Sequence, residues 1–134
     1  MDDYRRGGHT KYSLKAHIIF VTKYRRRIFD REPEDRSIKE LMYLAAESFD
    51  LNIIRMEMDG DHIHMLIDFR PDMTISDIVK YMKQYSTYYM WKRHESVLRL
   101  YYWKRRILWS DGYFACSIGQ VSQEIIERYI ENQG

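Results

Sequence analysis

Two histidines, a tyrosine and a glutamine have the types and spacing needed for chemistry on a phosphodiester. His62 and His64 are two positions apart in an apolar segment, and on a β-strand such residues point to the same face. Tyr129 and Gln133 are four positions apart near the C-terminus, and on a helix such residues share a face. If the two faces meet, two imidazoles and an amide oxygen could bind a divalent metal ion, Mg²⁺ or Mn²⁺, beside a phenol.

The phenol indicates covalent catalysis. Tyrosine is a poor nucleophile at its ordinary pKa of about 10. A metal ion that polarises the scissile phosphate makes its attack feasible. The resulting phosphotyrosine would keep the energy of the broken bond, so that the hydroxyl of another strand could reverse the step. Strand transfer needs such a residue, whereas hydrolysis does not.

Each of these residues also has a plain structural interpretation. A histidine on a strand is more often an ordinary surface or core residue than a ligand. Tyr129 continues an apolar helical stripe with Val121 and Ile125, so a packing role is natural. Gln133 extends the same stripe with an amide, which favours a ligand over a core residue.

Length and composition predict one globular domain spanning residues 1–134. The chain has 134 residues, of which 45% are hydrophobic and 31% charged. No apolar run approaches the roughly 18 residues that span a bilayer, and the N-terminus lacks the apolar segment of a signal peptide. Cys116 is the only cysteine, which excludes an intrachain disulfide. We therefore expect a cytoplasmic protein that does not bind membranes.

The net charge is only +2, but the basic residues fall in runs such as 23–27 and 104–106. Aromatic residues make up 15% of the chain, and many lie beside these runs. Cations that follow phosphates and rings that stack on bases suit a single-stranded nucleic acid. A merely solvated basic face is an equally good interpretation of the composition alone.

The apolar periodicity predicts the order β-α-β-β-α-β followed by a C-terminal helix. This order is typical of an α+β, ferredoxin-like (RRM-like) fold, with two helices on one face of an antiparallel sheet. Residues 1–12 are expected to form a flexible arm, 94–106 an irregular or short helical connection, and 119–134 a mobile helix after Gly119. Strands are predicted over 14–22, 51–58, 61–69, 107–109 and 113–117, and helices over 33–50, 74–93 and 121–133.

Several motifs together resemble a known family. His62-Ile63-His64 fits the HUH pattern, in which U is a bulky hydrophobe, and residues 129–133 fit Tyr-x-x-x-Gln. With the blocks 17–26, 61–67 and 109–114 in the same order, the chain resembles the single-tyrosine HUH transposases called TnpA, of the insertion-sequence 200/605 group. The resemblance covers nearly the whole chain.

This resemblance implies a bacterial or archaeal enzyme that moves DNA through single-stranded intermediates. Tyr129 would attack the DNA backbone, leaving a 5′-phosphotyrosine and a free 3′-hydroxyl, while His62, His64 and Gln133 bind Mg²⁺ or Mn²⁺. The protein would be a homodimer, whose active sites can combine the histidines of one chain with the tyrosine helix of the other. We assign recognition of hairpins at the element ends to Lys23, Arg25, Arg26, Arg27, Lys83, Lys104, Arg105 and Arg106.

Three alternatives remain open. A host-adopted relative that nicks repeated hairpins would use the same chemistry, so only the genomic surroundings distinguish it from a transposase that moves its own element. A non-catalytic domain that binds single-stranded nucleic acid would stack bases on its tyrosines and bind without metal or Tyr129. A metal-dependent hydrolase would need an acidic residue beside the histidines. For that role, Asp61 is expected to point to the opposite face, and Asp68 lies further along the strand.

Overall fold

A four-stranded antiparallel sheet forms the centre of the protein. The structure, a computed structural model, describes residues 5–7, 10–12, 14–117 and 123–133. The strands follow the order β4-β5-β3-β6, and each neighbouring pair is antiparallel. This arrangement confirms the predicted ferredoxin-like α+β fold. The strands are β3 (Leu14–Val21), β4 (Asn52–Asp59), β5 (His62–Phe69) and β6 (Phe114–Ser117).

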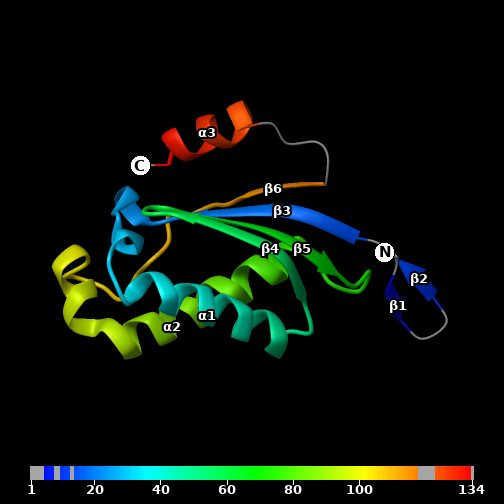
Figure 1. Cartoon of the computed structure of the whole chain (residues 1–134), viewed down its shortest axis with the longest axis horizontal. Helices are drawn as coiled ribbons and strands as arrows, with labels where there is room; N and C mark the ends of the chain where they lie inside the picture. Colours follow the sequence, from blue (N-terminus) through cyan, green and yellow to red (C-terminus); the bar gives the residue numbers. More distant parts are fainter. Residues whose placement is uncertain (1–4, 8–9, 13, 118–122, 134) are drawn as a thin grey trace.

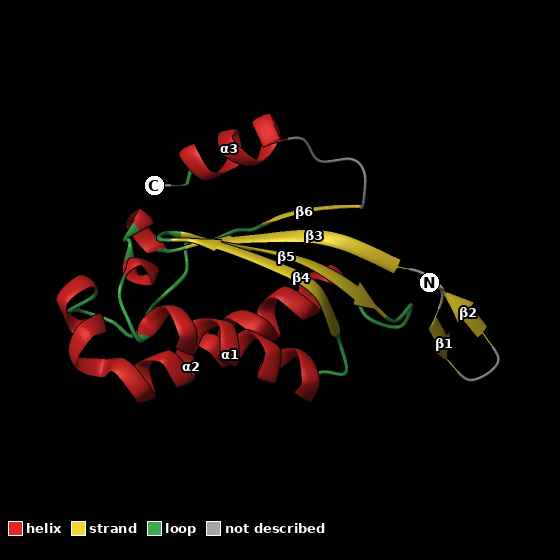
Figure 2. Cartoon of the chain, in the orientation of Figure 1, coloured by secondary structure: helices red, strands yellow, loops and turns green. Residues whose placement is uncertain are grey.

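The helices lie on both faces of this sheet (Figures 1 and 2). Helices α1 (Glu34–Ser48) and α2 (Ile75–Tyr101) cover one face. Helix α3 (Gln123–Glu131) lies over the other face, above β6 and β3 in the view of Figure 1. Short 3₁₀ turns, η1 (Lys23–Arg25) and η2 (Ile28–Asp30), follow β3. Within the described ranges, no helix is long and apolar enough to cross a membrane.

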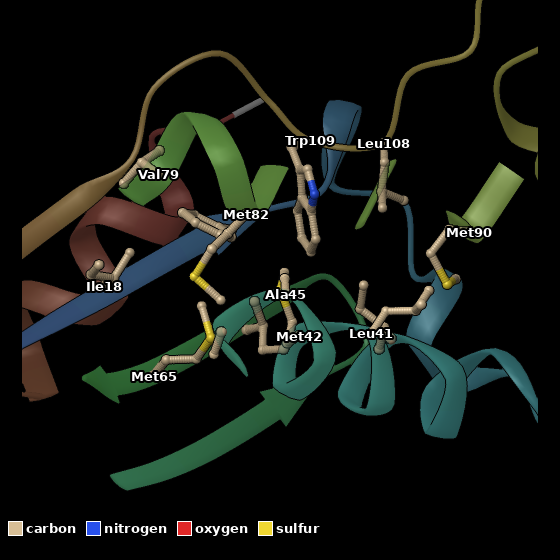
Figure 3. Packing of buried hydrophobic residues seen from close by; sticks show 14 of the residues in the cluster. Ile18, Leu41, Met42, Ala45, Met65, Val79, Met82, Met90, Leu108 and Trp109 are labelled. Carbon is tan, nitrogen blue, oxygen red and sulfur yellow. The ribbon is translucent and has the colours of Figure 1, made fainter. Parts of the chain in front are cut away.

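Strand alternation explains where the core lies. Ile18 and Phe20 of β3 and Ile63 and Met65 of β5 point toward α1 and α2 and are fully buried. Apolar residues of α1 that are three or four positions apart pack against these strand residues, because this spacing places them on one face of the helix. Figure 3 shows this packing, with Leu41, Met42 and Ala45 of α1 facing Met82 and Met90 of α2 and Trp109.

Helix α2 is longer than predicted. It continues to Tyr101, whereas the sequence predicted an end near residue 93. The helix bends at His94, where φ is −133° and ψ is 38°. The His94 ring contacts the start of α1, with Nδ1 3.1 Å from the Glu34 carboxylate and Nε2 2.8 Å from the Ser37 hydroxyl. Since no glycine or proline lies between residues 94 and 101, the chain resumes the helix after the bend.

Two other segments differ from the prediction. Residues 107–109 do not form a strand, and only Trp109 makes an isolated bridge, with Thr22. The predicted flexible arm contains a small antiparallel hairpin of β1 (Arg5–Gly7) and β2 (Thr10–Tyr12). The predicted hinge at Gly119, and the rest of 118–122 with Gly134, lie outside the described residues, so the mobility of 119–134 stays a prediction.

Candidate active site

The two histidines lie on the face of β5 that turns away from α1 and α2. Ile63 and Met65, between and after them, are fully buried against those helices, whereas His62 and His64 are half-buried. The predicted strand alternation is therefore confirmed. Since α3 covers the same face of the sheet, the histidines and the tyrosine helix lie on one side of the molecule.

His62 is held by a carboxylate in the turn before β5. The Asp61 Oδ1 lies 2.9 Å from His62 Nδ1, and Arg25 Nε donates to Asp61 Oδ2 at 3.1 Å. Burial alone would raise the pKa of Asp61, but the hydrogen bonds from His62 and Arg25 outweigh it, and the pKa lies below its ordinary value. The carboxylate therefore accepts a hydrogen bond from Nδ1–H of His62, and in the neutral ring this leaves Nε2 as the nitrogen with a free electron pair.

The position of Asp61 corrects the sequence prediction. Asp61 was expected to point to the opposite face from the histidines because it was assigned to the strand. It lies in the turn instead, where strand alternation does not apply, and its side chain folds back onto His62.

The hairpin before His62 is tightly packed. A Cβ added to Gly60 would lie 2.5 Å from Asp30 Oδ1 and 2.8 Å from Arg27 Cζ, so a larger residue there would displace these two side chains. Arg27 bridges two carboxylates there, with Nε 2.7 Å from Asp30 Oδ2 and NH2 2.9 Å from Asp59 Oδ1. Arg27 therefore fastens η2 to the turn that carries Asp61.

His64 has a histidine partner that the sequence analysis did not identify. His17 Nδ1 lies 2.9 Å from His64 Nε2, and the two rings are tilted with centroids 5.0 Å apart. Burial lowers the pKa of both imidazoles, and their mutual repulsion as cations lowers that of His64 further. Both rings are therefore neutral near neutral pH, and one donates its N–H to the other. Alternation along β3 places His17 on this face, but the contact follows from the register, which pairs His17 with Leu66.

Tyr129 packs against the sheet. With Ile130 it covers Ile19 and Val21 of β3, and its ring centroid lies 5.6 Å from that of Phe114 on β6. Its hydroxyl is buried and has no hydrogen-bond partner within the described part of the chain. Burial raises the pKa of Tyr129 to about 12, so the phenol is protonated at neutral pH. The apolar stripe of Val121, Ile125 and Tyr129 is not packed along its length, because Ile125 is 40% exposed. Val121 lies outside the described residues.

Gln133 lies at the same end of the sheet as His62. Its Oε1 accepts a hydrogen bond from the Ser110 hydroxyl at 3.3 Å, and the Ser110 backbone N–H donates to Val21 O at 2.8 Å. Val21 lies directly opposite His62 in the β3–β5 register. Like His17, Ser110 was missed by the sequence analysis, because only the folded chain brings it to Gln133.

Lys83 anchors the loop that carries Ser110. Its Nζ donates to Ser110 O at 2.9 Å and to Gly112 O at 2.6 Å, and lies 5.6 Å from the centroid of the Phe20 ring. Burial lowers the pKa of this ammonium. Lys83 also lines a groove of about 840 Å³ between α2 and residues 106–112. The side chain predicted to contact DNA thus makes structural contacts.

The donor set fits a divalent ion. Imidazoles suit first-row divalent ions, and an amide oxygen together with water suits Mg²⁺ and Mn²⁺. Among the described residues, no three histidine, cysteine or acidic side chains come together as a metal site, so a third protein ligand would be of another type, as Gln133 is. Asp68 shares the histidine face but lies at the far end of β5, opposite Lys15.

The eight cations predicted to bind DNA fall into two groups. Five have partners: besides Lys83, these are Lys23 with Asp111, Arg25 with Asp61, Arg27 with Asp30 and Asp59, and Arg106 with Glu95. Arg26, Lys104 and Arg105 form no ion pair with any residue that the structure describes. These three cations remain for an anionic ligand.

Comparisons with known proteins identify relatives of the chain. The family model described as "Transposase IS200 like" matches residues 10–133. The chain is 30% identical over 133 residues to the transposase for insertion sequence element IS200 of Salmonella typhimurium, covering 99% of this chain and 85% of that protein. It is also 30% identical over 129 residues to the ISDra2 transposase TnpA of Deinococcus radiodurans, covering 96% of this chain and 90% of that protein.

Two solved structures are similar in fold. A crystal structure of a transposase from Deinococcus radiodurans matches with a TM-score of 0.86 and 29% identity, covering 96% of this chain and 97% of that one. A REP-associated tyrosine transposase bound to a REP hairpin matches with a TM-score of 0.56 and 10% identity, covering 99% of this chain and 70% of that one. At that identity the second likeness concerns the fold alone.

Proposed function

The chain belongs to the IS200-like transposase family and is an enzyme that acts on DNA, and we propose that it cuts and rejoins single-stranded DNA through Tyr129. The observation that carries this proposal is the position of α3. Its Tyr129 and the Gln133 that follows lie over the sheet face that carries His62 and His64. A nucleophile and three candidate ligands thus share one side of the molecule.

His62, His64 and Gln133 would bind Mg²⁺ or Mn²⁺, which would polarise the scissile phosphate and neutralise developing charge. Asp61 holds His62 through Nδ1, so Nε2 would be its ligating atom. His17 holds His64 through Nε2, so Nδ1 would be its ligating atom. Ligating histidines commonly keep their second nitrogen on such a partner, which fixes the tautomer and the ring orientation. His17 and Asp61 would therefore be positioning residues.

The reaction would exchange one phosphodiester for another. The Tyr129 oxygen forms a bond to phosphorus while the bond from phosphorus to the 3′-oxygen breaks. The phenol loses its proton, and the departing 3′-oxygen gains one to become a hydroxyl. A 5′-phosphotyrosine results, which the 3′-hydroxyl of a second strand attacks in the reverse sense. No water is consumed, so the number of phosphodiester bonds is conserved.

The Tyr129 hydroxyl, which has no hydrogen-bond partner among the residues that the structure describes, supports this proposal over a non-catalytic binding domain. Leaving a buried hydroxyl without a hydrogen bond is costly, and most buried polar groups in proteins have a partner. A phenylalanine would fill the same place against Phe114 and Ile19 without that cost.

A labelling experiment tests the proposal. Single-stranded DNA carrying the ends of the element that encodes the chain is labelled at its 5′ or 3′ end and incubated with Mg²⁺, Mn²⁺ or a chelator. We expect a metal-dependent covalent adduct on the 3′ fragment only, absent in Tyr129→Phe. Cleavage without an adduct, unaffected by the substitution, would indicate hydrolysis. Tight, metal-independent binding without cleavage would indicate a binding domain.

A further inference from the structure

Of the eight cations predicted to bind DNA, the three without an ion pair to any described residue lie around one cavity. This cavity has a volume of about 320 Å³ and lies where η1 meets the end of α2. Its lining consists mainly of aromatic and basic side chains, namely Tyr24, Tyr101, Tyr102, Trp103, Lys104 and Arg105. We call it the Tyr24–Trp103 pocket. The unpaired cations Lys104 and Arg105 line it, and Arg26 lies over the ring of Tyr24.

Two rings of the pocket are held in the solvent. Tyr24 is 53% exposed and Trp103 is 69% exposed, although tryptophan is highly buried on average. Each has a cation over its face: Lys23 Nζ lies 5.5 Å from the Tyr24 centroid, Arg26 Cζ 5.9 Å from it, and Lys104 Nζ 5.0 Å from that of Trp103. Exposed rings beside unpaired cations are the elements of a site for single-stranded nucleic acid.

The backbone that presents Tyr24 is strained. Tyr24 and Arg25 have φ values of 59° and 53°, in the left-handed region that bulky residues rarely adopt. The Tyr102 hydroxyl donates to Lys23 O at 2.8 Å, and the Arg25 side chain donates to Asp61 at 3.1 Å, which hold the turn in place. This turn directs Tyr24 outward and Arg25 inward, toward the carboxylate that holds His62. Such strain is retained where a specific presentation of side chains is needed.

We propose that the Tyr24–Trp103 pocket binds one unpaired base of single-stranded DNA. The base stacks on the two exposed rings, while Arg26, Lys104 and Arg105 neutralise the phosphates on either side. Because the same turn supports Asp61 and His62, a strand held here enters the sheet face of the candidate active site from the η1 end. The inference rests on the proposed function for the identity of the ligand, but it concerns binding and not cleavage.

The test measures binding in chelator, so that it is independent of cleavage. The full chain is titrated into fluorescently labelled single-stranded DNA from the element ends, and Kd is measured at several salt concentrations. We expect Tyr24→Leu and Trp103→Leu each to weaken binding roughly 5- to 100-fold with an unchanged salt slope, because a stacking contact is lost. Arg105→Gln is expected to make the dependence of log Kd on log salt concentration less steep, by the amount that corresponds to about one lost phosphate contact. Tyr24→Phe keeps the ring and binds like the natural chain.

Tyr88 provides the matched control. It is 60% exposed and has Lys92 Nζ 5.8 Å from its ring centroid, but it lines the larger groove and not the pocket. Tyr88→Leu is expected to bind normally. Unchanged affinity in both pocket variants, or an equal loss in Tyr88→Leu, would overturn the proposal. Thermal unfolding of each variant shows whether its fold is intact, and Trp103, which lies in a loop, remains informative if Tyr24→Leu unfolds.

An abasic scan adds a second readout. Removing the bases of the DNA one at a time identifies the position that fills the pocket. We expect one abasic site to weaken binding to the natural chain as much as Trp103→Leu does, with no further loss when the two changes are combined. Additive losses at every position would contradict a single-base site. A normal metal-dependent adduct alongside either negative result would leave the proposed function intact and reject the pocket alone.

Discussion

At the residue scale, the candidate ligands are characterised by their partners. Asp61 holds one nitrogen of His62, His17 holds one nitrogen of His64, and Ser110 holds the amide oxygen of Gln133. The first two partners leave the other ring nitrogen for a metal ion. The Ser110 hydroxyl donates to one of the two lone pairs of Gln133 Oε1, which leaves the other lone pair for a metal ion.

We predict that His17 determines metal affinity. His17→Leu removes the acceptor for His64 Nε2 and is expected to weaken Mn²⁺ binding 10- to 100-fold, as is typical when a partner of a ligating histidine is lost. His17→Asn should restore most of it, because its amide oxygen can replace Nδ1 as the acceptor. Titration of the free Mn²⁺ signal by electron paramagnetic resonance measures the affinity.

Cys116 offers the control for this experiment, since it lies opposite His17 in the register of β3 and β6. Cys116→Ala alters the same face without touching the His17–His64 contact and should bind Mn²⁺ normally. Equal affinity of His17→Leu and the natural chain would show that His17 has no part in positioning His64.

The burial of Tyr129 predicts the pH dependence of cleavage. In the proposed reaction the phenolate of Tyr129 is the attacking form. Burial raises the pKa of Tyr129 to about 12, so the phenolate would be a minority throughout the neutral range. Below the pKa the phenolate fraction rises tenfold per pH unit. The single-turnover cleavage rate should therefore also rise about tenfold per pH unit between roughly pH 7 and 9. A plateau near neutrality would mean that the phenol reacts from a different environment.

Sequence reasoning succeeds for residues whose neighbours are local. The common face of His62 and His64 follows from strand alternation. That of Tyr129 and Gln133 was predicted from a helix running to residue 133, but α3 ends at Glu131 and Gln133 lies beyond it. His17 and Ser110 could not be found in this way. His17 is 47 positions from His64, and Ser110 is 23 positions from Gln133, so their contacts depend on strand register and on a loop without periodicity.

At the element scale, α2 links the core to the site. One of its faces buries Ile78, Val79 and Met82, and Lys83 on the adjoining face fixes the loop of Ser110. Residues 75–93 were correctly predicted as helix because their apolar spacing is regular. The end of the helix at Tyr101 was not predicted, because the bend at His94 depends on contacts with Glu34 and Ser37 of α1.

We predict that Lys83 contributes to stability. Lys83→Met keeps an apolar stem but leaves two carbonyl oxygens without their donor, which should lower the free energy of unfolding by about 1–3 kcal/mol in urea denaturation. Lys80→Met, at an exposed position of the same helix, should change it by less than about 0.5 kcal/mol. Unchanged stability of Lys83→Met together with weakened DNA binding would instead support the role predicted from the sequence.

At the scale of the whole molecule, the sheet separates the main hydrophobic core from the candidate active site. Helices α1 and α2 form the main core on one face, and the candidate active site occupies the other, under α3 (Figure 1). The layer order followed from the sequence, because it requires only the order of elements and the face that each buries. The expected homodimer stays a prediction.

Subunit mixing tests how the sites are assembled. In this structure Tyr129 and Gln133 contact the sheet and the Ser110 loop of their own chain. If the dimer keeps this arrangement, mixing and refolding His64→Ala with Tyr129→Phe chains yields no active site, and cleavage should stay absent. If the helices are exchanged between subunits, one complete site forms in each mixed dimer and cleavage returns, which would contradict the arrangement within one chain.

The most direct test of the central claim is to locate the covalent bond. The natural chain is reacted with single-stranded element-end DNA and metal, treated with nuclease and protease, and analysed by mass spectrometry. The account predicts a nucleotide attached through a 5′-phosphate to the peptide that contains Tyr129. A nucleotide on another residue, or efficient strand transfer with no modified peptide, would contradict it.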